Sequence, residues 1–101
     1  MNSQPELQSM LEELIHSKNV YFQPPASIKM NYPAIRYSRN NIENKKADDS
    51  VYSQRIAYQL TVIDYDPDSK ITKLVSKLPY CSFNTSYASD NLNHDVFTLY
   101  Y

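Results

Sequence analysis

The sequence predicts an α+β domain in which two helices pack on an antiparallel four-stranded sheet, in the order α-β-β-α-β-β. The chain has 101 residues, a length typical of one domain over residues 1–101. Two segments repeat apolar side chains at helical spacing, and four others have the alternation or the composition of strands. Hydrophobic residues make up 42% of the chain and charged residues 21%, so wholesale disorder is not expected.

The first predicted helix covers residues 6–17. Pro5 and Glu6 suit its start, because proline needs no hydrogen-bond donor there and an acidic side chain favours the positive end of the helix dipole. Apolar side chains recur three and four residues apart and form one stripe, made of Leu7, Met10, Leu11, Leu14 and Ile15.

An extended connector and a long hairpin follow this helix. Residues 19–31 contain two consecutive prolines, which exclude a helix and favour a connector. Residues 32–39 have the composition of a first strand, and residues 51–64 alternate polar and apolar side chains as a half-buried second strand does. The polar segment 40–50 predicts the tip of a long hairpin between these first two strands. The sheet with the second helix is expected to occupy residues 32–101.

The second predicted helix covers residues 67–78. Asp66 is the expected N-cap and Pro67 the first helical residue, and a proline at the far end stops the helix. Residues 80–87 and 94–101 then read as the last two strands of the sheet.

Composition excludes several classes of function. The chain contains no glycine, so glycine-rich phosphate-binding loops of the Walker and dinucleotide types are absent. Ten basic and eleven acidic residues give a net charge of −1, which argues against nucleic-acid binding through a strong positive field. A single cysteine excludes an internal disulfide, and neither a secretory signal nor a membrane-spanning apolar run is present. A cytoplasmic location is therefore expected.

Cys81 is the one candidate nucleophile, with His94 and Asp95 as candidate partners. A nucleophile needs a base within hydrogen-bond reach and an oxyanion site, and the sequence offers no glycine-lined turn for such a site. Cys81 also lies in an apolar strand, where a small buried side chain is the simpler interpretation. We therefore predict that the protein is not an enzyme.

Two groups of residues have the chemistry of metal ligands. Asp64, Asp66 and Asp68 alternate as in a calcium loop, but the glycine and the glutamate that such a loop requires are missing, and helix capping explains the aspartates. His16 and His94 belong to no known ligand spacing. We predict neither a metal site nor a cofactor.

Four segments carry a resemblance to a known family. They read YPAIRY at 32–37, YQLTVIDYDPDS at 58–69, LPYCSF at 78–83 and DNLNHDVFTLYY at 90–101. Over residues 31–101 the chain resembles the tail terminators of tailed bacteriophages, also described as tail-completion, head–tail joining or neck proteins. The N-terminal helix matches this family in character only.

The resemblance implies a structural virion protein without catalytic activity. Proteins of this family form hexameric rings that cap the tail tube and join the tail to the head connector. The expected partners are other copies of the chain, the tail-tube protein and the head-completion or connector protein, with DNA passing through the lumen without specific binding. The implied location is the neck of the virion, after assembly in the bacterial cytoplasm. Two alternatives stay open: a head-completion or stopper protein on the portal side, and a small regulatory protein-binding module.

The hairpin supplies the candidate contact residues of such a ring. Charges of both signs near its tip suit a polar contact between rings, although a hairpin tip that is merely solvated explains them as well. The residues expected to make this contact are Arg36, Arg39, Lys45, Lys46 and Asp48.

Overall fold

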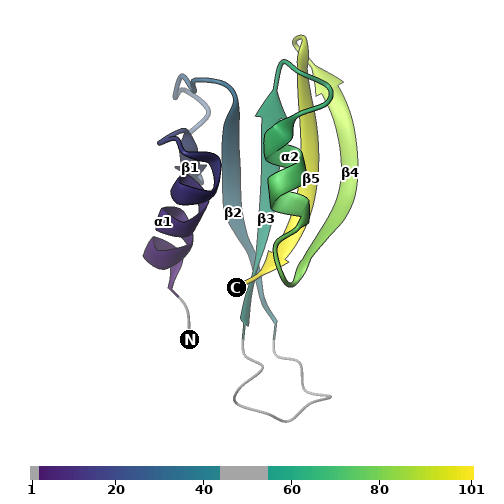
Figure 1. Ribbon diagram of the computed structural model, residues 1–101. Helices are drawn as coiled ribbons and strands as arrows, with labels where there is room; N and C mark the ends of the chain where they lie inside the picture. The colour runs from purple at the N-terminus through teal and green to yellow at the C-terminus, as the bar shows by residue number, and fades with distance from the viewer. Residues whose placement is uncertain (1–2, 44–54) are drawn as a thin grey trace.

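The structure is a computed structural model that describes residues 3–43 and 55–101. Within these residues, two helices and five strands follow one another along the chain. They are α1 (Gln4–Ile15), β1 (Val20–Phe22), β2 (Ala34–Glu43), β3 (Arg55–Asp64), α2 (Lys70–Ser76), β4 (Cys81–Ser89) and β5 (Leu92–Tyr100). Both helices lie on the same face of the sheet, as Figure 1 shows.

The sheet is mixed and has the strand order β1-β2-β3-β5-β4 within the described part of the chain. β1 runs parallel to β2, and the other neighbours are antiparallel. The predicted antiparallel four-stranded sheet in the order α-β-β-α-β-β is therefore wrong, because an extra strand lies between the first helix and the first predicted strand. The three residues of β1 are too few to show a strand period, and the prolines that follow favoured a connector.

The core lies between the two helices and the sheet. Leu7 and Leu11 of α1 and Val75 of α2 are fully buried against the middle of the sheet. The strands contribute the other buried residues of this cluster, which are Val20, Ile35, Tyr37, Tyr58, Leu60, Val62, Phe97 and Leu99. The face opposite the helices, called the open face here, carries no helix from the described residues.

Serine side chains fix the start of both helices. Ser3 forms a capping box with Glu6, so α1 begins at Gln4 and includes Pro5, which was expected to precede it. α2 is shorter than the predicted 67–78, because Ser69 and not Asp66 is its N-cap. The Asp66 carboxylate instead accepts a hydrogen bond from the backbone N–H of Asp68, which forms a turn before the helix.

The hairpin strands also extend beyond their predicted ends. β2 and β3 pair up to Glu43 and Arg55, with a bulge near Asn40, so part of the predicted loop 40–50 is strand. The tip lies outside the described residues. β4 and β5 are joined by a two-residue turn at Asp90 and Asn91, whose φ angles are 54° and 63°. Asx side chains tolerate this left-handed backbone, which explains how a chain without glycine makes so tight a hairpin.

Candidate protein interface

β4 forms one outer edge of the sheet, and no described element covers it (Figure 1). All of its nine residues except the half-buried Cys81 are exposed, and none is charged or a proline. Alternate residues of such a strand direct backbone N–H and C=O groups outward. Natural sheets normally protect an edge of this kind with lysine, proline or a covering segment, so the open edge is suited to pairing with another chain.

Three exposed aromatic rings belong to β4 or directly precede it. Tyr80, Phe83 and Tyr87 are 62%, 57% and 47% exposed, although aromatic side chains are usually buried to a greater extent. The Tyr80 ring lies 4.0 Å from the guanidinium carbon of Arg55, so a cation–π contact orients it. Exposed tyrosine and phenylalanine rings are enriched at protein interfaces.

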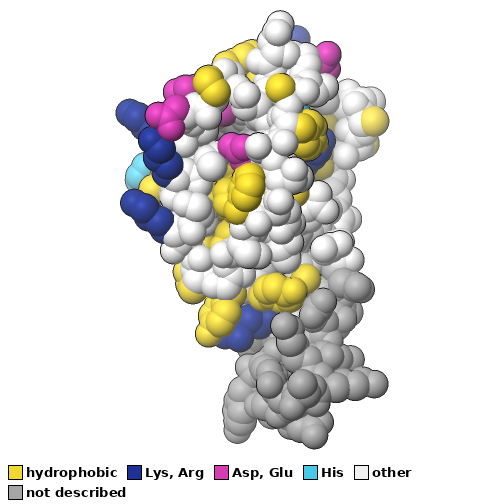
Figure 2. All heavy atoms as spheres, turned by 90° about the vertical axis from the view of Figure 1, so that its right-hand side faces the viewer, with side chains coloured by type: hydrophobic (Ala, Val, Ile, Leu, Met, Phe, Trp, Pro, Cys, Tyr) yellow, Lys and Arg dark blue, Asp and Glu magenta, His cyan; other side chains and the backbone are white. Residues whose placement is uncertain are grey.

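A bulge distributes these rings over both faces of the sheet. The register between β4 and β5 shifts between Phe83 and Thr85. Phe83 packs edge-on against Phe97, which belongs to the core under the helices, whereas Tyr87 stacks on His94 with ring centroids 4.6 Å apart. Figure 2 looks at this side of the molecule, where uncharged surface predominates and Lys and Arg side chains lie mainly at the margins.

The opposite edge of the sheet, formed by β1, is closed from within the molecule. The side-chain amide of Gln8 in α1 donates a hydrogen bond of 2.9 Å to the backbone oxygen of Val20. The Val20 N–H donates to the oxygen of Lys18, at 2.8 Å. The outward backbone groups of Val20 are therefore satisfied, which makes this three-residue edge, called the closed edge here, a poorer template for a further strand than β4.

The expected contact residues lie away from the open edge. Arg36 and Arg39 belong to β2, beside the closed edge; Arg36 is half-buried and Arg39 exposed. Lys45, Lys46 and Asp48 lie outside the described residues. The charge pattern of the sequence therefore pointed to β2 and the hairpin, while the structure exposes an uncharged strand on the far side of the sheet.

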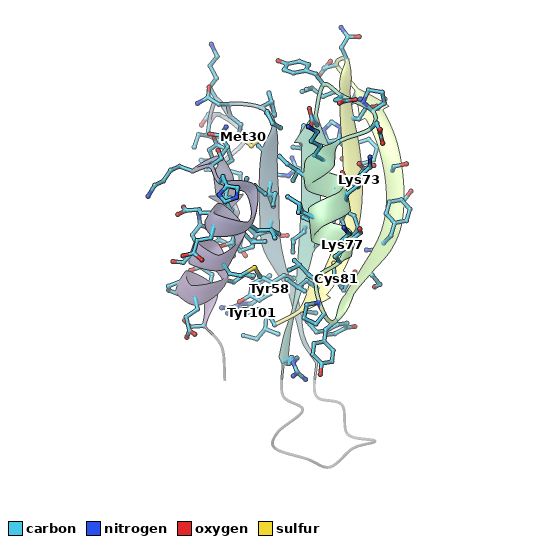
Figure 3. The ribbon with its side chains drawn as sticks, viewed as in Figure 1. Met30, Tyr58, Lys73, Lys77, Cys81 and Tyr101 are labelled. Carbon is cyan, nitrogen blue, oxygen red and sulfur yellow. The ribbon has the colours of Figure 1, made fainter. Side chains whose placement is uncertain are left out.

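The candidate nucleophile and its partners are not brought together. Cys81 is aligned with Leu99, whereas His94 is aligned with Tyr87, five residues away along β5. The Asp95 carboxylate accepts a hydrogen bond of 2.6 Å from the Thr72 hydroxyl. Burial raises the pKa of the Cys81 thiol, which disfavours the thiolate that a nucleophile needs. Figure 3 shows Cys81 beneath α2, with Tyr58 and Tyr101 nearer to α1.

The candidate metal ligands have structural roles. The Asp64 carboxylate accepts a hydrogen bond from the backbone N–H of Asp66, and His16 ends α1 with a φ of 53°. No cluster of three or more His, Cys, Asp or Glu side chains suited to a metal occurs in residues 3–43 and 55–101. Among the described helices, none has the length and apolar character needed to cross a membrane.

Comparison with known proteins gave no match: no protein-family model, no curated protein and no solved structure is similar to this chain. The function is therefore inferred from the residues and the geometry of the chain itself.

Sequence reasoning missed the open edge, although a signal for it was present. Residues 81–89 contain neither charge nor proline, and a strand of that composition is either central and buried or an edge with a partner. The position of a strand within its sheet depends on topology: β5 pairs with both β3 and β4, which leaves β4 at the end of the order. Only the arrangement in space shows that the uncharged strand is an edge.

Proposed function

We propose that the protein is a structural virion protein of a tailed bacteriophage, a tail terminator whose ring caps the tail tube and joins the tail to the head connector. The tail-terminator part of this proposal comes from the sequence resemblance, and the observation that supports an assembly is the open edge of β4, nine uncharged residues that include the exposed rings of Phe83 and Tyr87. A monomer in solution would expose this edge to uncontrolled pairing, whereas a subunit of an assembly would bury it.

The difference between the two edges of the sheet supports a closed assembly. If both edges were open, successive copies could add strands to one another and extend the sheet without limit. Here the Gln8 side chain satisfies the Val20 oxygen at the β1 edge, so a neighbouring copy meets β4 either with its own β4, which closes as a two-fold pair, or, as a ring requires, with another surface in a heterologous contact. Such a heterologous contact, repeated around an axis, forms a ring when the rotation closes.

The charged residues of the hairpin complete the proposed assembly. Arg36, Arg39, Lys45, Lys46 and Asp48 remain the candidate contacts between the ring and its axial neighbours, the tail tube on one side and the connector on the other. Charged groups in such a contact fix orientation and discourage wrong partners. An uncharged subunit contact and a charged axial contact would let each partner recognise a different part of the surface.

Imaging phage particles made without this gene tests the proposal. A terminator leaves full heads beside tails that are abnormally long or unjoined, and this is the expected result. Heads that lose DNA beside tails of normal length would instead identify a head-completion or stopper protein on the portal side. Normal joined virions would overturn a structural role and favour a regulatory protein-binding module.

The purified protein provides a second test. Native mass spectrometry and electron microscopy are expected to show a ring, of six copies if the family resemblance holds. A monomer at high concentration would contradict the ring and favour the regulatory module.

A further inference from the structure

The open face of the sheet contains a polar hollow around Arg36. It has a volume of about 350 Å³ and is lined by Arg36, Ser38, Gln59, Thr61, Gln23 and Pro24. Strand register explains the grouping, because Arg36 is aligned with Thr61 and Ser38 with Gln59 across β2 and β3. Gln23 and Pro24 follow β1 and form the wall on that side.

The lining is rich in hydrogen-bond donors and carries one positive charge. The Arg36 guanidinium has five N–H donors and no acceptor, the two hydroxyls each offer a donor, and Gln59 adds an amide. The side-chain oxygen of Gln23 already accepts a hydrogen bond of 3.1 Å from the backbone N–H of Arg39, so the NH₂ group is the part of this side chain that can donate to a ligand. No acidic side chain lines the hollow.

Two of these groups lack the partners that such groups normally have. Thr61 as a residue is only 3% exposed, but its hydroxyl oxygen is not one of the enclosed atoms without a partner, a group that among the described residues contains the Tyr58 hydroxyl alone. Within residues 3–43 and 55–101, no hydrogen bond or ion pair satisfies the Thr61 hydroxyl or the Arg36 guanidinium. The Thr61 hydroxyl and the half-buried Arg36 guanidinium both open into the hollow, where they are available to a ligand that enters it.

We propose that the Arg36 hollow is a binding site for a carboxylate group. A carboxylate has two oxygens that match the fork of a guanidinium, and its remaining lone pairs suit hydroxyl and amide donors. Its single negative charge balances the single positive charge of the lining. The hollow lies on the open face and not on the outer edge of β4, so it is separate from the proposed contact at β4, although Arg36 is also one of the candidate axial contacts.

The carboxylate can come from two sources. In an assembly, an Asp or Glu side chain of a neighbouring copy would supply it and add a specific contact; otherwise a small free carboxylic acid would occupy the hollow. The shared chemistry is tested with acetate as the probe, and the source is tested by comparing dilute with assembled protein.

The experiment follows the Thr61 methyl and Arg36 side-chain NMR signals during titration of dilute protein with sodium acetate, with sodium chloride lowered to keep ionic strength constant. Saturable shifts at both residues are expected. Arg36→Gln should weaken acetate binding by about tenfold or more, the usual effect of losing a charged hydrogen bond. Lys70→Gln is the control, because it removes one exposed positive charge from α2 on the other face of the sheet, and its effect should stay within about twofold.

A second variant tests the same site if Arg36→Gln does not fold. Thr61→Val removes the hydroxyl while preserving the shape of the side chain, and it should weaken acetate binding with no loss of stability. Shifts that do not saturate, that chloride reproduces, or that persist in both variants would overturn the carboxylate site. None of these outcomes depends on ring formation.

Repeating the titration on concentrated protein identifies the source. If a neighbouring copy supplies the carboxylate, assembled protein no longer responds to acetate, and Arg36→Gln raises the dissociation constant of the assembly by about tenfold. If a free carboxylate is the ligand, dilute and concentrated protein respond alike and the assembly is unchanged. A protein that stays monomeric would refute the proposed ring, and the acetate titration would still decide whether the site exists.

Discussion

The two edges of the sheet solve the same physical problem in opposite ways. Each edge strand leaves backbone groups that need partners. At β1 the partner is internal, because the side-chain amide of Gln8 in α1 donates a hydrogen bond to the Val20 oxygen and accepts one from the Tyr37 hydroxyl. At β4 the strand is three times as long, nine residues against three, and no described residue closes its outer side. The difference indicates that one edge is finished within the chain and the other is completed by a second molecule.

The largest expected effect comes from charging the open edge. Ser86→Lys together with Ala88→Lys places like charges on exposed positions of β4, and lysine on an edge strand discourages pairing. Like charges within an interface cost several kcal/mol, so the dissociation constant of the assembly should rise at least about a hundredfold. Analytical ultracentrifugation over a concentration series measures this change.

The control for this variant adds the same charge elsewhere. Ser9 in α1 and Ser76 in α2 are exposed serines on the helices, and changing both to lysine should leave the assembly within about twofold of the original. An assembly that tolerates the lysines on β4 would show that the open edge is not the contact between subunits.

Opening the closed edge should affect stability. Gln8→Leu keeps the size of the side chain but removes the donor to the Val20 oxygen and the acceptor for the Tyr37 hydroxyl. Unsatisfied buried groups of this kind cost about 2 kcal/mol, and urea unfolding of the dilute monomer should show a free energy of unfolding lower by that amount. Ser9→Ala on the same helix is the control and should change the free energy of unfolding by less than about 0.5 kcal/mol. A stable Gln8→Leu variant would mean that the side chain does not close the edge.

Two buried tyrosines provide a sharper form of the comparison. Tyr37, beside the closed edge, accepts a hydrogen bond from Gln4 at 2.7 Å and donates one to Gln8 at 2.6 Å. Tyr58, one strand closer to the open edge, is fully buried, and its hydroxyl has no partner among the described residues. Tyr37→Phe should therefore lower the free energy of unfolding by about 1–1.5 kcal/mol, and Tyr58→Phe should raise it by up to about 1 kcal/mol.

Urea unfolding of the two variants at one protein concentration measures both changes, and opposite signs are the diagnostic result. Burial also raises the pKa of the Tyr37 phenol, so at alkaline pH this hydroxyl keeps its proton beyond the range of an ordinary tyrosine. The unfolded chain loses this proton at the ordinary tyrosine pKa while the folded chain keeps it, so the stability that Tyr37 contributes is complete below that pKa and falls as the pH rises through it. Destabilisation by Tyr58→Phe would show that its hydroxyl has a partner after all.

The sequence predicted those parts of the fold whose signals are local. Apolar spacing located both helices, and alternation located the strand at 55–64. These signals are local, because the side chains of a buried face recur at a fixed interval within one segment. The strand β1 was missed, since three residues show no period and their pairing with β2 depends on residues fifteen positions later, as in Val20 with Ile35. Helix starts were misplaced where several capping residues compete, as with Asp66 and Ser69.

The candidate sites were harder to predict for a related reason. The contact residues were predicted from the charges of the hairpin, and this led to Arg36 and Arg39. The open edge is defined by missing charges and by its place at the end of the sheet, and the hollow at Arg36 is defined by neighbours from two other segments. Both properties arise from contacts between residues far apart in the chain.

The smallest expected effect concerns the turn that aligns the open edge with β5. Asn91 has a φ of 63°, and glycine adopts this backbone at lower cost than asparagine, so Asn91→Gly should raise the free energy of unfolding by about 0.5 kcal/mol. Ser89→Gly, at the end of β4, is the matched control. Glycine within a strand should lower the free energy of unfolding by about 0.5–1 kcal/mol. Urea unfolding measures both changes in the free energy of unfolding.

If the turn only connects the strands, neither variant should alter the assembly, because no backbone group on the outer side of β4 changes. A changed assembly would mean that the turn itself contacts the neighbouring molecule, and the contact would then extend past the open edge to the end of the hairpin.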